Sequence, residues 1–223
     1  MKNKTVFISG ASSGIGQETA LRFASAGADL VLTYNRHKKD GERTRERCLE
    51  SGSREVLLIK LDVMDNKSIA SAVKQTRKVF GSLDILINNA GTGVVKPFDD
   101  STVGDIEQQL RTNLEGLIKV THAFLPYVRE AVINIGSFLS KNAYADMAVY
   151  CASKYGVRGF TQALAQEQPD LRICCVHPDL TATRLTGGQG RPPLSVADII
   201  FRAAAKKIKV KNGVDIDVWE ILK

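Results

Sequence analysis

The stretch TVFISGASSGIG, residues 5–16, places an apolar run rich in β-branched residues directly before a turn with three glycines. Such a run favours a β-strand, and a helical pattern follows at 14–26. Gly10, Gly14 and Gly16 allow a tight turn and a close approach of the backbone to a phosphate, which the first N–H groups of the helix would bind. The spacing differs from Gly-x-Gly-x-x-Gly, and glycine turns also join strands to helices without any ligand. The stretch therefore favours a nucleotide site without excluding a plain turn.

The same order of strand and helix repeats along the whole chain. Near-continuously apolar strands that alternate with helices form a parallel sheet covered on both faces, so the pattern predicts an α/β fold with a doubly wound parallel sheet. We expect strands at 5–9, 29–34, 56–61, 83–88, 131–135, 172–176 and 214–218, and helices at 14–26, 38–51, 66–80, 104–128, 149–167 and 196–208. The long irregular stretch 177–195 is of a length that often serves as a lid over a site.

Length and composition suit one globular domain, residues 1–223, of which 43% are hydrophobic. The apolar runs are far shorter than the roughly 20 residues that span a bilayer, and residues 1–8 resemble a strand rather than a signal peptide. We therefore expect a cytoplasmic protein without membrane contact. The four cysteines lack the spacing of metal ligands, so we expect no metal and reduced, mostly buried thiols at Cys48, Cys151, Cys174 and Cys175.

The net charge of +7 comes largely from two basic clusters, at 36–47 and 202–211. Basic clusters can bind nucleic acid, a phosphate-bearing cofactor or an acidic partner. The first cluster also contains Asp40, Glu42 and Glu46, and no aromatic side chain lies between its cations for base stacking. We therefore do not expect nucleic-acid binding.

The end of the second strand reads Tyr34, Asn35, Arg36. A site specific for NAD carries an Asp or Glu near this point to bind the ribose hydroxyls. The missing carboxylate and the nearby arginine favour a ribose 2′-phosphate, hence NADP(H), with NAD(H) as the alternative. Arg36 is also compatible with an ordinary solvated cation.

Tyr150 and Lys154 lie four positions apart in AVYCASKYG, residues 148–156, and share one face of the expected helix. Phenols ordinarily ionise near pH 10, and a neighbouring ammonium favours the phenolate. Taken alone, the pair also fits an ordinary solvated surface contact.

Six motifs in order show that the chain resembles the short-chain dehydrogenases/reductases, nicotinamide-dependent enzymes with a Rossmann-type fold. The resemblance covers nearly the whole chain. The motifs are SGASSGIG at 9–16, LDV with Asp62, NNAG at 88–91, TNLEG with Asn113, NIGS with Ser137, and YCASK with Tyr150 and Lys154.

The resemblance implies a role for each of four side chains. Tyr150 would be the general acid or base, and Lys154 would favour its phenolate and bind the nicotinamide ribose. Ser137 would donate a hydrogen bond to the substrate oxygen, and Asn113 would hold a water that links Lys154 to solvent. As a strand-end turn residue, Ser137 also has a purely structural explanation.

The resemblance also implies the contacts of the cofactor. Asp62 and Val63 would flank the adenine, and Thr183 would reach the carboxamide or the phosphates. The complete expected set is Gly10, Ser12, Ser13, Gly14, Ile15, Gly16, Tyr34, Asn35, Arg36, Asp62, Val63, Asn89, Ala90, Gly91, Tyr150, Lys154, Pro178 and Thr183. Asp179 departs from the family's Pro-Gly, and its carboxylate is expected near the nicotinamide, where it would disfavour anionic substrates or weaken the cofactor contact.

The leading hypothesis is an NADP(H)-dependent oxidoreductase that interconverts a small-molecule carbonyl and a secondary alcohol, with a ketone or a 3-oxoacyl thioester as substrate. The alternative is a non-catalytic sensor or regulatory subunit on the same fold. A methyltransferase would give no role to Tyr150 and Lys154. The small residues Ala152, Gly156 and Gly159, with Ala163, form one helix face, and by resemblance this face pairs with its copy in a homodimer or homotetramer. Packing against the protein's own helix at 104–128 would explain these residues equally well.

Overall fold

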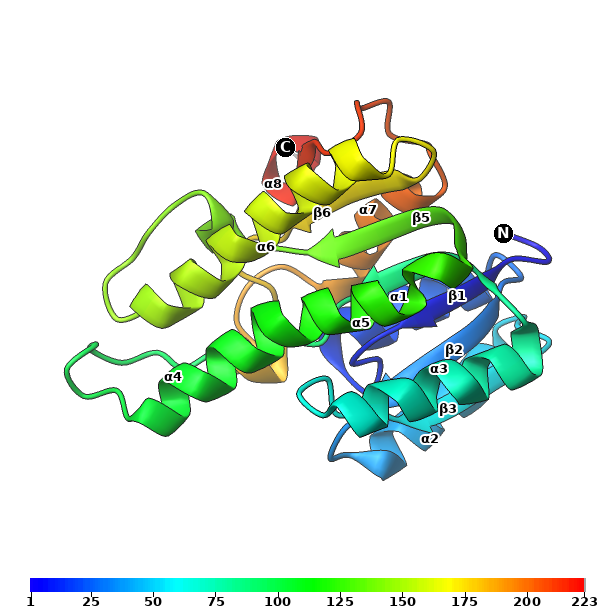
Figure 1. Ribbon diagram of the computed structural model, residues 1–223, viewed down its shortest axis with the longest axis horizontal. Helices are drawn as coiled ribbons and strands as arrows, with labels where there is room; N and C mark the ends of the chain where they lie inside the picture. Colours follow the sequence, from blue (N-terminus) through cyan, green and yellow to red (C-terminus); the bar gives the residue numbers. More distant parts are fainter. Residues whose placement is uncertain (223) are drawn as a thin grey trace.

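A sheet of seven strands forms the centre of the computed structural model, which describes residues 1–222 (Figure 1). All its strand pairings are parallel, in the order β3-β2-β1-β4-β5-β6-β7. This confirms the predicted doubly wound sheet; residue 223, the last of the predicted domain, lies outside the described residues. The strands are β1 (Thr5–Ile8), β2 (Asp29–Tyr34), β3 (Val56–Lys60), β4 (Leu83–Asn88), β5 (Val128–Ile135), β6 (Arg172–His177) and β7 (Asp215–Asp217).

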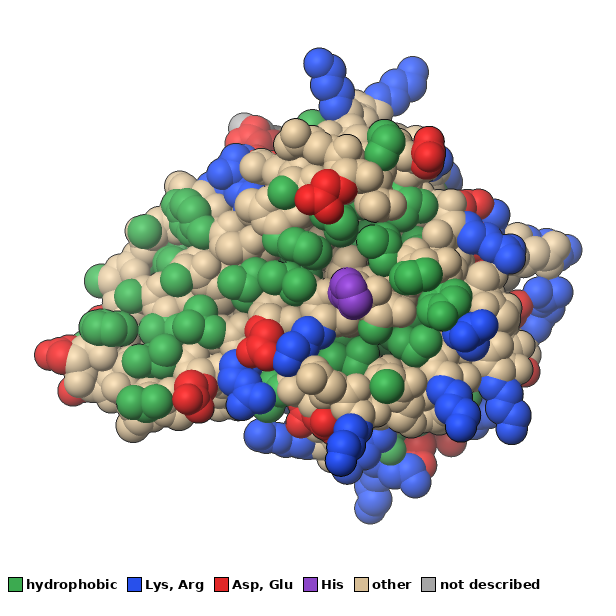
Figure 2. Space-filling model, in the orientation of Figure 1, with side chains coloured by type: hydrophobic (Ala, Val, Ile, Leu, Met, Phe, Trp, Pro, Cys, Tyr) green, Lys and Arg blue, Asp and Glu red, His purple; other side chains and the backbone are tan. Residues whose placement is uncertain are grey.

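Helices cover both faces of the sheet (Figure 1). One face carries α1 (Gly14–Ala24), α2 (Lys38–Glu50) and α7 (Pro193–Ala204), and the other carries α3 (Asn66–Phe80), α5 (Gly116–Phe124) and α6 (Ala148–Glu167). α4 (Val103–Leu110) extends past the sheet beside α6, and α8 (Val218–Ile221) follows β7. Hydrophobic side chains gather on the visible surface over α4 and α6, whereas many Lys and Arg side chains lie near α2 and α3 (Figure 2).

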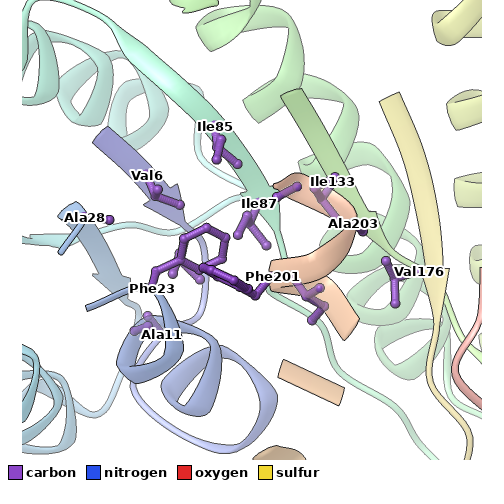
Figure 3. Packing of buried hydrophobic residues seen from close by; sticks show 14 of the residues in the cluster. Val6, Ala11, Phe23, Ala28, Ile85, Ile87, Ile133, Val176, Phe201 and Ala203 are labelled. Carbon is purple, nitrogen blue, oxygen red and sulfur yellow. The ribbon is translucent and has the colours of Figure 1, made fainter. Parts of the chain in front are cut away.

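The core has two layers because successive strand residues point to opposite faces of the sheet. On one face, Phe23 of α1 and Phe201 of α7 meet edge to face with ring centres 5.1 Å apart, in the same cluster as Ile87 of β4 (Figure 3). On the other face, the ring centres of Phe7 and Phe124 are 4.5 Å apart. The sheet is therefore held rigidly, and its carboxyl ends can position a site at the point between β1 and β4 where the strand order reverses.

The cysteines are buried free thiols, as predicted. Cys174 faces the α1 and α7 layer, while Cys175 packs with Leu117 and Val157 on the opposite face. Burial raises the pKa of Cys48 and of Cys175 to about 12. Within residues 1–222, no three His, Cys, Asp or Glu side chains are grouped to hold a metal, and no helix has the length and apolar character that crossing a membrane requires.

The prediction of one continuous helix at 104–128 is wrong. A π-helical turn at Arg111–Glu115 separates α4 from α5, and a 3-10 turn at Leu125–Tyr127 leads into β5, which begins at residue 128 rather than 131. Pro126 has no N–H to continue the helical hydrogen bonds, so α5 ends before it. The π turn arises from the side chain of Asn113, described below.

The irregular stretch after β6 is a folded loop. Arg191 N donates to the Leu180 carbonyl and Ala182 N donates to the Arg191 carbonyl, each over 2.8 Å, so the two ends of the loop lie side by side. A 3-10 turn, Arg184–Thr186, forms its tip, and α7 begins at Pro193, three residues before the predicted start.

Candidate active site

The glycine loop between β1 and α1 has the shape that its sequence predicts. Gly10 and Gly14 have φ of +67° and +58°, which side chains rarely permit. A Cβ on Gly16 would overlap the Gly10 carbonyl oxygen and the Asn89 amide, so only glycine fits there. Ser13 precedes α1 without capping it through its side chain, which leaves the first N–H groups of the helix available to an anion.

The neighbouring strands hold this loop in place. Ala11 N donates to the Thr33 carbonyl over 2.8 Å, and the Asn89 side-chain amide donates to the carbonyls of Ser9 and Gly10 over 2.9 and 3.0 Å. Ser9 Oγ accepts from the N–H groups of Asn89 and Ala90. The Asn89 amide therefore shapes the loop beneath the predicted cofactor trough. Ser9, the first residue of the SGASSGIG motif, is a support that was not among the expected cofactor contacts.

A cleft of about 380 Å³ lies between the glycine loop and the loop after β6. Its walls approach closely at one point, where a Cβ on Gly14 would lie 3.0 Å from Thr183 Cγ2. Arg184 Nη2 bridges to Asp40 Oδ2 over 2.9 Å, and this hydrogen bond lowers the pKa of Asp40. The lining residues are Ser12, Ser13, Gly14, Gln17, Glu18, Asp40, Arg43, Ala182, Thr183, Arg184, Pro192, Pro193 and Leu194. Open helix amides, glycine backbone and a cleft of this size together fit the phosphates of a dinucleotide.

The end of β2 bears no carboxylate, and Asn35 and Arg36 are exposed there. Among residues 1–222, no acidic side chain forms an ion pair with Arg36, whereas Lys38 bridges to Glu42. A cation on this surface is thus free to meet a ligand phosphate.

The predicted adenine contacts follow β3. Asp62 Oδ1 accepts from Met64 N over 2.9 Å, which closes the turn. Val63 is buried, and its side chain packs so closely on α5 that a Cβ on Gly116 would lie 2.7 Å from it. Only the backbone of Val63 and the outer edge of Asp62 therefore remain for a ligand.

Tyr150 and Lys154 share one face of α6, as the spacing predicted. Lys154 is 6% exposed, and its Nζ lies 5.8 Å from the centre of the Tyr150 ring. The ammonium donates to the Ile135 carbonyl at the end of β5 over 2.9 Å. A Cβ on Gly91 would lie 3.9 Å from this nitrogen, so the loop that follows β4, here called the β4 loop (residues 89–102), reaches the same place. Lys154 is therefore a buried cation between Tyr150 and the strand ends, not a solvated surface charge.

Asn113 connects the β4 loop to α6. Its Oδ1 accepts from Thr92 N, and its Nδ2 donates to the Thr92 carbonyl, both over 2.8 Å. Nδ2 also lies 3.1 Å from Ser153 Oγ, which donates to the Tyr150 carbonyl over 2.7 Å. These bonds explain the π turn, because the wider turn lets the backbone of Thr92 reach the side-chain amide of Asn113. Sequence reasoning gave no role to Thr92, which directly follows the NNAG motif, or to Ser153, although Ser153 lies within YCASK.

Ser137 follows β5, on the strand whose end carbonyl binds Lys154. Its Oγ accepts from Leu139 N over 3.1 Å, so its hydroxyl hydrogen remains available to donate elsewhere. Gly93 allows the loop after β4 to pass the Tyr150 ring, because a Cβ on this glycine would lie 3.1 Å from Tyr150 Cδ2. The predicted catalytic side chains thus come from three places: the π turn between α4 and α5 carries Asn113, the end of β5 carries Ser137, and one face of α6 carries Tyr150 and Lys154.

Asp179 is not the free carboxylate that the sequence led us to expect. Arg191 binds it through two hydrogen bonds of 2.9 and 2.7 Å, and these lower the pKa of Asp179. Asp179 also lacks a positive φ, so no left-handed turn replaces the family's glycine. Its charge is balanced within the loop rather than presented to a ligand.

Comparison with known sequences assigns the family. The sequence profile of the short chain dehydrogenases matches residues 4–192. The NADP-dependent 3-hydroxy acid dehydrogenase of Schizosaccharomyces pombe is 36% identical over 211 residues, which cover 91% of this chain and 81% of that protein. Dehydrogenase/reductase SDR family member 7 of Mus musculus is 31% identical over 188 residues, 80% of this chain, and the match spans about half, 55%, of that relative.

Solved structures agree with the sequence comparison. A short chain dehydrogenase from Burkholderia cenocepacia in complex with NADP has a TM-score of 0.89 and 27% identity, covering 97% of this chain and 96% of that one. The 3-ketoacyl-(acyl-carrier-protein) reductase from Brucella melitensis, complexed with NADH, has a TM-score of 0.90 and 25% identity, covering 97% of each chain. The chain belongs to the short-chain dehydrogenase/reductase family and is an oxidoreductase.

Proposed function

We propose that the protein uses NADP(H) to interconvert a small-molecule carbonyl and a secondary alcohol, with a ketone or a 3-oxoacyl thioester as the carbonyl compound. The observation that carries this proposal is the buried Lys154 ammonium beside the Tyr150 ring. Burying a charge is costly unless bonds compensate it, and the Ile135 carbonyl supplies one such bond. A cation held there favours negative charge on the neighbouring phenol oxygen.

Each side chain has a defined task in the reductive direction. A bound nicotinamide cofactor supplies the hydride that the carbonyl carbon receives. Negative charge then gathers on the carbonyl oxygen, to which Tyr150 delivers its proton. Ser137 donates its free hydroxyl hydrogen to the same oxygen and orients it. Asn113 holds the β4 loop against α6, and in the proposed relay it also holds the water that links Lys154 to solvent.

The preference for NADP(H) is supported by the end of β2. A 2′-phosphate would meet Arg36 and no carboxylate at residues 34–36. The yeast relative is described as NADP-dependent and the Burkholderia structure contains NADP. The Brucella reductase contains NADH, so NAD(H) is retained as the second cofactor.

The alternative, a non-catalytic sensor, rests on two features, the Asp179 carboxylate and the basic surface. Arg191 pairs with Asp179, which weakens the first of them. We further propose one cytoplasmic domain, 1–223, that assembles as a homodimer or homotetramer. The face of α6 with Ala152, Gly159 and Ala163 is exposed, as this assembly requires.

A substrate screen tests the proposed reaction. Purified protein is mixed with NADPH and a panel of ketones, 3-oxoacyl thioesters and aldehydes, and cofactor oxidation is followed at the absorbance of the reduced nicotinamide. We expect oxidation with at least one ketone or 3-oxoacyl compound, and the reverse reaction with its alcohol. Binding of NADPH without oxidation across the whole panel would contradict the proposed reaction and favour the sensor.

A further inference from the structure

His177, the last residue of β6, lies directly behind Ser137. The chain has three histidines, and His177 is the buried one, with a side chain that is 0% exposed. Its Nδ1 lies 3.1 Å from the Ser137 carbonyl oxygen, and its Nε2 lies 3.0 Å from Asp215 Oδ1. A carbonyl and a carboxylate only accept hydrogen bonds, so both contacts are hydrogen bonds only when each ring nitrogen carries a proton. With a single proton on the ring, one of the two contacts lacks a donor.

The backbone before Ser137 is shaped to admit this ring. A Cβ on Gly136 would overlap His177 Nδ1 and would lie 2.8 Å from Cys175 Sγ. Any residue other than glycine at position 136 would therefore push the imidazole away from the end of β5.

Residues 176–178, at the end of β6, bind residues 136–138, which follow β5. Gly136 N donates to the Val176 carbonyl over 2.8 Å, and Phe138 N donates to the Pro178 carbonyl over 2.7 Å. Between these two backbone bonds, the Ser137 carbonyl meets the side chain of His177. The imidazole thus continues the strand pairing at Ser137, the residue whose hydroxyl binds the substrate oxygen in the proposed function.

Charged groups surround the far side of the ring. Asp215 Oδ2 accepts from Arg158 Nε over 2.7 Å, and Lys141 Nζ lies 3.7 Å from the same oxygen and 2.7 Å from Asp217 Oδ2. Burial opposes the ionisation of Asp215, but the bonds from His177 and Arg158 outweigh it and lower the pKa of Asp215. Burial lowers the pKa of His177, and Asp215 opposes that shift. The Asp215 carboxylate is thus anchored to α6 and gives the ring a rigid support.

We propose that His177 is a positioning residue, which donates from Nδ1 to the Ser137 carbonyl and so holds the Ser137 hydroxyl in line with the substrate oxygen. The inference rests on the proposed function, in which Ser137 binds that oxygen. It gives β7 a part in the site, because Asp215 supports the ring from the last strand.

Two substitutions of His177 distinguish the contributions of the two ring nitrogens. In His177→Asn, the amide nitrogen replaces Nδ1 and still reaches Ser137. In His177→Gln, the amide nitrogen replaces Nε2 and reaches only Asp215. We expect kcat of the Gln variant to fall about tenfold, since small misplacements of a reacting geometry are costly, while the Asn variant loses about threefold or less. The NADPH dissociation constant should change little in both, because the ring contacts Ser137 and Asp215 rather than a residue of the glycine loop. Equal kcat losses in the two variants would overturn the proposal in favour of a merely structural role.

A double-mutant cycle tests whether His177 acts through Ser137. If it does, His177→Gln slows the Ser137→Ala variant by less than about twofold, because the group it positions is already missing. Full additivity would overturn the proposal. Should Ser137→Ala alone leave kcat unchanged, the proposed function of Ser137 fails; should Ser137→Ala be slow while His177→Gln matches the wild type, the inference about His177 fails by itself.

A measurement on the wild-type protein keeps the test independent of variant folding. Nitrogen-15 NMR of the histidine rings reports which nitrogen carries a proton. We expect a proton on Nδ1 of His177, assigned by comparison with the His177→Asn variant or, if that variant does not fold, by elimination with substitutions of the exposed His37 and His122. An unprotonated Nδ1 at neutral pH would overturn the proposal.

Discussion

The guanidinium of Arg191 donates to both carboxylate oxygens of Asp179, through Nε over 2.9 Å and Nη2 over 2.7 Å. Two parallel charge-assisted bonds of this kind are stronger and more directional than a single ion pair. They join the two ends of the loop after β6. The negative charge of Asp179, which stands where the family has a glycine, is therefore neutralised within the loop.

The first prediction concerns the stability of this loop. Asp179→Asn is expected to destabilise the protein by about 1 kcal/mol at pH 7, a loss of about 2 to 4 °C in Tm. The Arg191 bond lowers the pKa of Asp179 below 3.8, so the folded state binds fewer protons there than the unfolded state. The stabilisation is present above pH 3.8 and disappears as the pH falls through the lower, folded value.

Thermal melting at several pH values checks this prediction. The difference in Tm between the wild type and Asp179→Asn should shrink below pH 3.8. Asp170→Asn, which changes an exposed residue, is the control and should have the Tm of the wild type at every pH. A difference that stays constant down to about pH 2 would show that the ion pair is not its cause.

The second prediction concerns the choice of cofactor. If the Arg36 contact with a 2′-phosphate contributes about 2 kcal/mol, NADPH binds about 30-fold more tightly than NADH. Arg36→Ala should remove most of that preference and leave NADH affinity unchanged. Lys38→Ala is the matched control, because Lys38 is already paired with Glu42 and should matter less.

Fluorescence titration of both reduced cofactors at two salt concentrations measures this preference. The NADPH affinity of the wild type should fall with salt more steeply than the NADH affinity. Equal affinities, or an NADH preference that Arg36→Ala does not change, would mean that the end of β2 has been misinterpreted.

The third prediction concerns assembly through α6. Gly156 does not belong to the open face, because a Cβ there would lie 2.6 Å from Leu114. At this residue the alternative explanation holds, in which α6 packs against the protein's own helix. Ala152, Gly159 and Ala163 are exposed, and within the described residues a Cβ on Gly159 would meet no atom within 4 Å beyond its chain neighbours and the nearby backbone of its own helix. Hydrophobic side chains gather over the same part of the surface (Figure 2). The residues that remain open allow a close approach of a second helix.

Light scattering at micromolar concentration should give two or four times the chain mass of 24.3 kDa. Gly159→Arg should reduce the mass by at least half, while the fold survives, since arginine favours a helix more than glycine does. A wild-type protein that is monomeric at this concentration, or a Gly159→Arg variant with the same mass as the wild type, would contradict the proposed interface.

Local patterns predicted most of the fold. β2 at 29–34 and α3 at 66–80 lie where the apolar periodicity placed them, because burial of one face determines both. The π turn was not predictable, since it depends on a bond between Asn113 and Thr92, which local periodicity does not record. Arg191 and Asp179 are likewise brought together only when the loop folds.

The site divides in the same way. The motifs placed Tyr150 and Lys154 on one helix face and the glycines in the turn, since each follows from the spacing within one element. His177 and Asp215 are 38 positions apart, and only the pairing of β6 with β7 joins them. Charge partners from separate strands therefore cannot be predicted from local sequence.

The central claim is that Tyr150 transfers the proton during carbonyl reduction. Its most direct test compares Tyr150→Phe with the wild type and with Tyr155→Phe, which makes the same chemical change at an exposed tyrosine further along the same helix. With a substrate from the screen, Tyr150→Phe should bind NADPH as tightly as the wild type while kcat falls by roughly 10²-fold or more, and Tyr155→Phe should retain wild-type turnover. Comparable kcat values for Tyr150→Phe and the wild type would contradict the account.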